Sequence, residues 1–193
     1  MDKGIEILRN LIQSRRSIFP KSYINNIIEE SVIEQVIEAA IYAPTHKKTE
    51  PWRFVAFTGD GKSKLGRHAA NIYKTLTPED LFLEKKYNSF IEKADQAGCV
   101  IAIIVSLHPD KLPEWEEIAS VGCAVQNMAL TAESFNLGGY WSSPALIINN
   151  IGDYLSLAPN EKCLGFYYLG YHNEALRKAV RTPLERKLTW IKD

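Results

Sequence analysis

The segment from Glu116 to Leu137 constrains the fold most, because its centre is apolar on nearly every side of a helix. Its apolar spacing predicts one long helix, and Gly138 stands where that helix would end. Twenty helical residues span about 30 Å, enough to cross the core of a small domain. Small residues along it would allow another helix to approach closely: Ala119, Gly122, Ala124 and Ala129. We therefore expect a central helix that packs on several sides and contributes to a dimer contact.

Four further helices are predicted from periodicity and capping signals, and one of them is a polar stretch from about Ser63 to Leu76. Apolar residues from Ile5 to Ile12 recur at helical spacing. Ser31 opens a capping box for a second helix, which Pro44 ends. Pro78, after a possible cap at Thr77, predicts the start of a helix in the polar middle of the chain.

Strand composition appears in four places and is mixed irregularly with the helices. The predicted strands are residues 52–57, 99–107, 140–141 and 161–171. Glycines inside the last strand suggest a bulge or a close backbone approach, and Thr58 to Gly61 predicts a turn. Because no regular β-α-β repeat is present, we expect an α+β fold, a central sheet flanked by helices, in a single domain over residues 1–193.

The composition argues against several classes of function. The chain has 23 basic residues (Lys and Arg) and 23 acidic residues (Asp and Glu). Its net charge therefore does not favour binding to nucleic acid or to an anionic membrane surface. The longest apolar run, residues 99–107, is far shorter than the about 20 residues that span a bilayer. The N-terminus lacks the pattern of a secretory signal, which predicts a cytoplasmic protein.

Metal, disulfide and nucleotide motifs are also missing from the sequence. The four histidines show no ligand spacing, so we expect no metal site. Cys99, Cys123 and Cys163 are widely spaced among apolar residues and are predicted to be core residues. No Gly-x-Gly-x-x-Gly follows a strand, and the stretch from Ala56 to Ser63 departs from a phosphate-binding loop at its first position.

A local anion site is predicted just after the first helix. Arg15 and Arg16 offer two guanidinium groups and Ser17 a hydroxyl, the chemistry that binds a phosphate dianion. The alternative is that the two arginines only answer the helix dipole. A rigid polar loop, residues 43–51, runs into the strand at Trp52 and holds its side chains at the edge of the core.

Five blocks in the same order resemble the nitroreductase family of flavin-dependent oxidoreductases, in particular its small NAD(P)H nitroreductases of the YdjA type. The blocks are Arg15 to Ile18, Ala43 to Phe54, Gly122 to Asn127, Gly138 to Ser143 and Leu164 to Gly170, followed by an Arg181-x-Pro183-Leu184-Glu185 tail. Together they cover most of the chain. The resemblance implies an α+β homodimer that holds FMN noncovalently at the subunit interface and transfers hydride equivalents from NAD(P)H to an acceptor in a ping-pong cycle.

The resemblance also implies roles for particular residues. Arg15, Arg16 and Ser17 correspond to the clamp on the FMN phosphate and ribityl chain, and Arg181 to a late arginine that reaches the phosphate. For Arg181 the alternative is a solvated basic cluster in the tail.

Further flavin contacts are implied on two loops. Tyr42 and His46 fall where similar proteins contact flavin, although His46 could instead be a loop histidine bonded to backbone. Trp141, Ser142 and Ser143 correspond to the block along the isoalloxazine ring, with a core tryptophan as the alternative. Arginine is usual at position 142 in the YdjA pattern.

The resemblance therefore predicts an FMN-dependent NAD(P)H oxidoreductase that reduces nitroaromatics, quinones or related small electrophiles. No protein nucleophile is needed, because the flavin carries the chemistry and the protein binds, orients and tunes it. The alternative is a flavin-binding protein that stores FMN or senses redox state without turnover.

Overall fold

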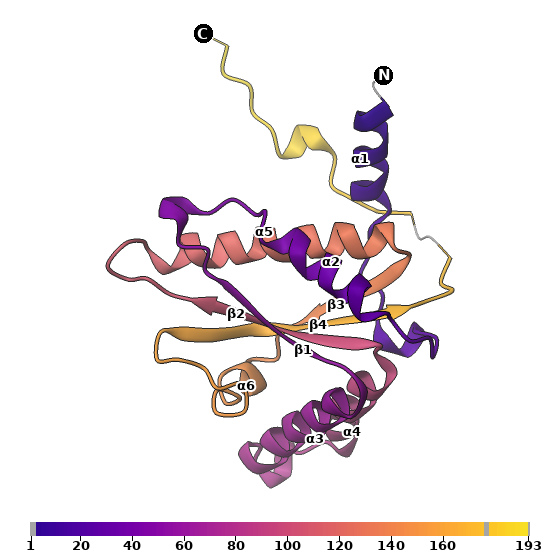
Figure 1. Ribbon diagram of the computed structural model, residues 1–193, viewed down its shortest axis with the longest axis vertical. Coiled ribbons are helices and arrows are strands. Elements are labelled where there is room, and N and C mark those ends of the chain that lie inside the picture. The colour runs from indigo at the N-terminus through magenta and orange to yellow at the C-terminus, as the bar shows by residue number, and fades with distance from the viewer. Residues whose placement is uncertain (1–2, 176–177, 193) are drawn as a thin grey trace.

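The computed structural model describes residues 3–175 and 178–192, and it centres on a four-stranded sheet (Figure 1). The strands are β1 Trp52–Phe57, β2 Cys99–Ser106, β3 Leu137–Ser142 and β4 Glu161–Tyr171. Their order across the sheet is β1-β2-β4-β3, and every neighbouring pair is antiparallel. The predicted α+β class with a mainly antiparallel sheet is therefore confirmed.

Six α-helices and four 3₁₀ turns are present in the described part of the chain. The helices are α1 Lys3–Ser14, α2 Glu30–Ala40, α3 Gly59–Leu76, α4 Glu84–Gln96, α5 Glu114–Ser134 and α6 Ala145–Ile148, and the turns are η1 Pro20–Ser22, η2 His46–Lys48, η3 Glu79–Leu81 and η4 Leu184–Arg186. In Figure 1, α2 and α5 cover one face of the sheet, and α3, α4 and α6 lie on the other. The helix α1 and the C-terminal segment both project away from the sheet on the α5 side.

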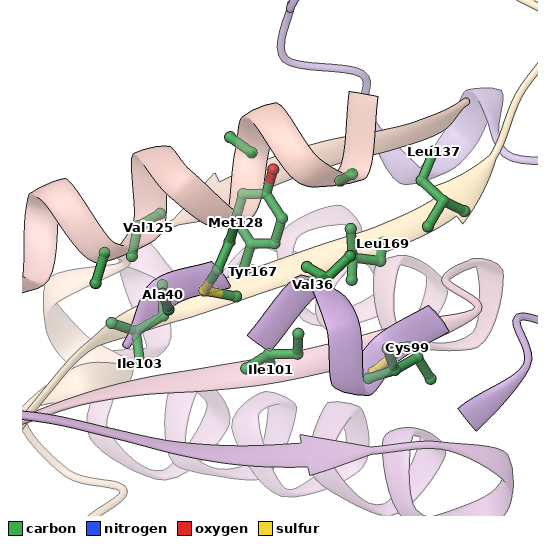
Figure 2. Close-up of a cluster of buried hydrophobic side chains, with 14 of the residues drawn as sticks. Val36, Ala40, Cys99, Ile101, Ile103, Val125, Met128, Leu137, Tyr167 and Leu169 are labelled. Carbon is green, nitrogen blue, oxygen red and sulfur yellow. The ribbon is translucent and has the colours of Figure 1, made fainter. Parts of the chain in front are cut away.

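Successive side chains of a strand point to opposite faces of the sheet, so the sheet carries two hydrophobic cores, one on each face. On β2, Ile101 and Ile103 face α2 and α5, whereas Val100 and Ala102 face α3 and α6. All four side chains are fully buried, which explains why this strand is apolar throughout. Figure 2 shows the first core, in which Met128 of α5 packs over the strands.

The end of the central helix differs from the sequence prediction. Helix α5 ends at Ser134, and Gly138 lies inside β3 instead of ending the helix. Asn136 takes the left-handed conformation, with φ of 57°, and Leu137 then pairs with Tyr171 of β4. Pairing with β4 therefore recruits residues that periodicity alone assigns to the helix.

Two helix starts and one turn were also wrong. Helix α2 begins at Glu30, one residue before the predicted cap at Ser31, and α3 begins at Gly59, inside the predicted turn. No α-helix starts at Pro78 in the described chain: α4 begins at Glu84, after Leu83 donates its backbone N–H to the Tyr73 hydroxyl at 3.0 Å. This tertiary contact holds the preceding segment outside the helix.

The exposure of one cysteine also departs from expectation, and much of the C-terminal segment is exposed. Cys99 and Cys163 are buried as predicted, but Cys123 is exposed on α5. The C-terminal segment mixes charged with large apolar residues, a composition that favours docking on another surface, but in the single chain Val180, Trp190 and Ile191 are exposed to 88%, 73% and 88%. Within the described residues, no helix is long and apolar enough to cross a bilayer.

Candidate cofactor site

The predicted phosphate clamp lies where the chain leaves α1 and joins the edge of the sheet. Ser17 forms an isolated parallel bridge with Gly139 of β3, and Ile18 donates its backbone N–H to the Gly139 carbonyl at 3.1 Å. Arg15 therefore directly follows the last residue of α1 and lies two positions before Ser17, the residue that forms the bridge. This attachment positions Arg15 and Ser17 over the gap between β3 and α5.

A cavity of about 190 Å³ opens there, and we call it the Arg15 cavity. Its lining is Arg15, Ser17, Gly122, Val125, Gln126, Ala129, Gly139, Trp141 and Tyr167. The sequence prediction named three of these, namely Arg15, Ser17 and Trp141. Arg15 is partly buried, and no hydrogen bond or ion pair of its guanidinium occurs within the described residues. A cation that is partly desolvated and unpaired is suited to an anionic ligand.

Trp141 forms one side of this cavity and does not belong to either core. Its indole N–H donates to the Leu164 carbonyl at 3.2 Å, and its side chain is 38% exposed. Gly165 makes this position possible, because a Cβ there would lie 2.6 Å from the indole nitrogen. Gly165 also has φ of 134° beside a bulge between β2 and β4, which confirms the irregularity predicted from the glycines in this strand.

Tyr167, the cross-strand partner of Trp141, forms another part of the wall, and Gly139 leaves space for it. Gly139 and Tyr167 lie on neighbouring strands, diagonal to each other in the β3–β4 register. A Cβ on Gly139 would overlap the Tyr167 hydroxyl and lie 2.5 Å from Cζ of the ring. Glycine at position 139 is therefore required for the tyrosine side chain to reach the cavity.

Arg16 is held differently from Arg15, although the two are adjacent. Its Nη1 donates to the carbonyls of Gln13 at 2.6 Å and of Arg15 at 2.7 Å, so it caps the C-terminus of α1. This agrees with the helix-dipole alternative for Arg16. With Lys178 and Arg181 it lines a separate cavity of about 690 Å³, the Arg16 cavity.

The other predicted contacts lie outside the Arg15 cavity. Tyr42 is 76% exposed after α2, and His46 Nδ1 donates to Glu116 Oε2 at 2.6 Å near the start of α5. Glu116 lies six residues before Gly122, the first cavity residue on α5, or about 9 Å along the helix axis. Ser142 is buried and Ser143 exposed, and neither lines the cavity.

The loop that carries His46 is braced against α5 by a buried carboxylate. Glu117 is 1% exposed and accepts from the backbone N–H of His108 at 2.7 Å and from its Nδ1 at 2.8 Å. Burial raises the pKa of Glu117, but hydrogen bonds from His108 and from Thr49 in this loop outweigh it and lower the pKa. Glu117 is therefore ionised, and its oxygens are hydrogen-bonded within the protein. Its role is to support the η2 turn, not to bind a ligand.

A second anchored carboxylate joins three segments at one end of the sheet. Glu161 accepts two hydrogen bonds from Arg53, both at 2.7 Å, and further bonds from Ser106 and the Ala158 backbone. The Arg53 guanidinium is the main reason that the pKa of Glu161 falls to about 2. This pair stabilises β1 and β4 on either side of β2.

Six of the nine cavity residues were missed in the sequence prediction of the site, and two of the six, Gln126 and Tyr167, carry polar side chains. Gln126 belongs to the block from Gly122 to Asn127 and Tyr167 to the block from Leu164 to Gly170, but neither was assigned a role. The alternation of side chains along a strand could have indicated Tyr167, because it places Tyr167 and Tyr168 on opposite faces of the sheet. Across the described residues, no cluster of His, Cys, Asp or Glu has metal-binding geometry.

Comparison with known proteins assigns this fold and sequence to one family. The sequence model of the nitroreductase family matches residues 12–171. The chain belongs to the nitroreductase family. It is 27% identical to the "Putative NAD(P)H nitroreductase YfhC" of Bacillus subtilis, over 95% of this chain and 93% of the relative. It is also 27% identical to the "Putative NAD(P)H nitroreductase YdjA" of Escherichia coli, over 78% and 81%.

One solved structure shows how far the fold is shared. The FMN-dependent nitroreductase NfnB of Mycobacterium smegmatis, in complex with NADPH, superposes with a TM-score of 0.79. The match covers 98% of this chain and 100% of that one at 15% identity. The family and the likeness to YdjA predicted from sequence motifs are therefore confirmed, whereas the cytoplasmic location and the roles of individual residues stay predictions.

Proposed function

We propose that the protein is an FMN-dependent NAD(P)H oxidoreductase that reduces nitroaromatic, quinone or related small electrophilic acceptors. The observation that carries this proposal is the Arg15 cavity, where an unpaired and partly buried guanidinium lies beside the hydroxyls of Ser17 and Tyr167. Family membership and the names of the relatives support the reaction class.

The donor set of the cavity fits the ribityl phosphate end of FMN. Arg15 can bind a phosphate through two parallel N–H donors, and Ser17 and Gln126 add a hydroxyl and an amide for polar oxygens. Trp141 forms a flat apolar wall on one side. When bound, FMN supplies hydride transfer, accepting it from NAD(P)H and delivering it to the acceptor in separate half-reactions.

We further propose that the site is completed by a second copy of the chain. A cavity of about 190 Å³ is smaller than the roughly 300–1,000 Å³ of most small-molecule sites. Helix α1 buries none of its residues, and Ile5, Leu8 and Ile12 are about half exposed. Exposed apolar surface of this kind supports an association between two chains.

In the homodimer, we propose that Tyr42 and His46 of one copy complete the flavin site of the other. Neither residue lines the Arg15 cavity of its own chain. Arg16 and Arg181 would add positive charge next to the phosphate from the Arg16 cavity. Ser142 and Ser143, which follow Trp141 at the end of β3, would approach the ring with backbone N–H groups.

The first test is an absorbance spectrum of the purified protein before and after anaerobic addition of NADH or NADPH. Flavin bands that bleach would support an oxidoreductase with bound FMN. Bands that persist with both reductants would contradict turnover and favour a flavin carrier. A protein that shows no flavin bands even after reconstitution with FMN would refute the proposal.

A variant of Arg15 tests the site itself. Loss of a hydrogen bond to a charged group costs about 1.5–3 kcal/mol, so Arg15→Gln should weaken FMN binding about 10- to 100-fold. The matched control is Arg67→Gln, because Arg67 is exposed on α3 on the opposite side of the sheet. Equal FMN affinity of Arg15→Gln and Arg67→Gln in a fluorescence titration would contradict the placement of the phosphate.

A further inference from the structure

The Tyr167 side chain is mostly buried, but its hydroxyl oxygen stays accessible from the Arg15 cavity, since no fully buried side-chain nitrogen or oxygen of the described residues lacks a hydrogen-bond partner. Tyr167 is 4% exposed, and its hydroxyl forms no hydrogen bond within residues 3–175 and 178–192. Buried tyrosine hydroxyls normally have partners, and Tyr23 is such a case: its hydroxyl lies 2.8 Å from the Ile18 carbonyl and 3.0 Å from that of Tyr168. The Tyr167 hydroxyl differs from that of Tyr23, because it makes no hydrogen bond within the described chain and is accessible from the cavity, where it can donate to a ligand.

The surroundings of this hydroxyl show where a partner would lie. Tyr167 stands on the face of β4 toward α5, with its ring beside Met128 and its oxygen directed away from the strand (Figure 2). The oxygen reaches Gly139, and the side chain lines the Arg15 cavity. Arg15 is the nearby cation that acts on this hydroxyl, and Glu133 is the nearby anion. The hydroxyl thus faces the same space as the unpaired guanidinium.

Tyr168 provides the contrast within the same strand. It is 6% exposed, and its hydroxyl also lacks a hydrogen-bond partner in the described chain. However, its side chain belongs to the core on the opposite face, where it stacks with Tyr140. An unused hydroxyl alone indicates nothing about a ligand, whereas at Tyr167 it coincides with a cavity and a cation.

We propose that Tyr167 is a cofactor-binding residue, whose hydroxyl donates a hydrogen bond to a phosphate or ribityl oxygen of the FMN held by Arg15 and Ser17. The inference rests on the proposed function, and it adds a contact that the sequence motifs did not assign. Burial raises the pKa of Tyr167 well above its ordinary value, so the group keeps its proton and remains a donor near neutral pH. Gly139 serves the same contact by leaving the hydroxyl room.

The test measures FMN binding to the apoprotein of Tyr167→Phe by fluorescence titration. A hydrogen bond to a charged oxygen corresponds to about tenfold or more in affinity, so the dissociation constant should rise by at least that factor. The melting temperature of the apoprotein should not fall, because the removed hydroxyl has no partner within the described chain. Tyr168→Phe is the matched control and should bind FMN like the wild type.

Riboflavin, which lacks the phosphate, distinguishes the two oxygens. A loss with FMN alone would assign the contact to the phosphate, and an equal loss with riboflavin would assign it to the ribityl chain. If wild type and Tyr167→Phe bind FMN equally, the inference about Tyr167 is wrong while the proposed function stands. If the wild type binds no flavin, both fail.

Discussion

Gly139→Ala is the most direct test of how the cavity wall is packed. A Cβ at this position would lie 2.5 Å from Cζ and 3.0 Å from Cε1 of Tyr167, where ordinary contacts are 3.4–4 Å. The ring is 4% exposed and packed in the first core, so it can retreat only by displacing its neighbours. Overpacking of this kind costs about 1–3 kcal/mol, and the alanine regains about 0.5–1 kcal/mol of strand entropy.

The expected net loss is thus about 1–2 kcal/mol in the free energy of unfolding. For a chain of 193 residues this corresponds to a melting temperature lower by about 2–8 °C. Urea unfolding followed by circular dichroism would measure it, with flavin removed and at one protein concentration, because dimerisation makes stability concentration-dependent. Gly139→Ala should also weaken FMN binding, since the new methyl group changes the wall of the Arg15 cavity that Gly139 and Tyr167 form.

Two comparisons make the result specific. Gly61→Ala is the same substitution in α3, where the nearest atom to the new Cβ would be 3.9 Å away, so it should stabilise by up to about 1 kcal/mol. In a Tyr167→Phe background the closest clashing atom is gone, and Gly139→Ala should cost less. A Gly139→Ala variant as stable as the wild type, or one equally destabilised in both backgrounds, would refute the packing argument.

The remaining predictions concern the anchored carboxylate and the thiols. Glu161→Gln should lower stability at neutral pH by about 1–2 kcal/mol, since Arg53 is partly exposed and solvent screens part of the loss. The folded pKa of Glu161 is about 2 and its ordinary value 4.5, so its stabilisation is present above pH 4.5 and is lost as the pH falls toward 2. Thermal unfolding between pH 7 and pH 3 should therefore decline less steeply in Glu161→Gln, and parallel curves would contradict this. With Ellman's reagent at pH 8, no more than Cys123 should react in the native protein, because burial raises the pKa of Cys99 to about 12 and of Cys163 to about 11. Reaction of more than one thiol per chain before urea is added would contradict the buried positions.

The candidate site could be predicted from sequence only where a chemical motif and its local structure coincide. Arg15, Ser17 and Trp141 were named from motifs, and all three line one cavity. Arg16 was grouped with Arg15 because they are adjacent, but one residue of rotation at the end of α1 sends its guanidinium to the helix carbonyls. Sequence adjacency does not specify which side of a helix end a side chain reaches.

The Arg15 cavity also contains residues whose importance depends on distant partners. Tyr167 gains its role from Gly139 of the neighbouring strand and from Arg15, which is more than 150 positions away. Neither contact leaves a local pattern in the sequence. Gln126 likewise reaches the cavity only because α5 lies across the sheet beside β3.

The sequence by itself determined the α+β class, the strands β1, β2 and β4, and the family. It could do so because these features leave local patterns in the chain. Apolar residues recur every second position in a strand and about every 3.6 positions in a helix, and the family motifs are short segments in a fixed order. The tertiary structure alone decided where α5 ends and where α4 begins: pairing of Leu137 with Tyr171 claims a residue that fits a helical pattern, and the Tyr73 hydroxyl holds Leu83 outside a helix. It also decided the cavity wall of Arg15, Gly139 and Tyr167, because hydrogen bonding and steric fit between segments far apart in the chain outweigh local preference.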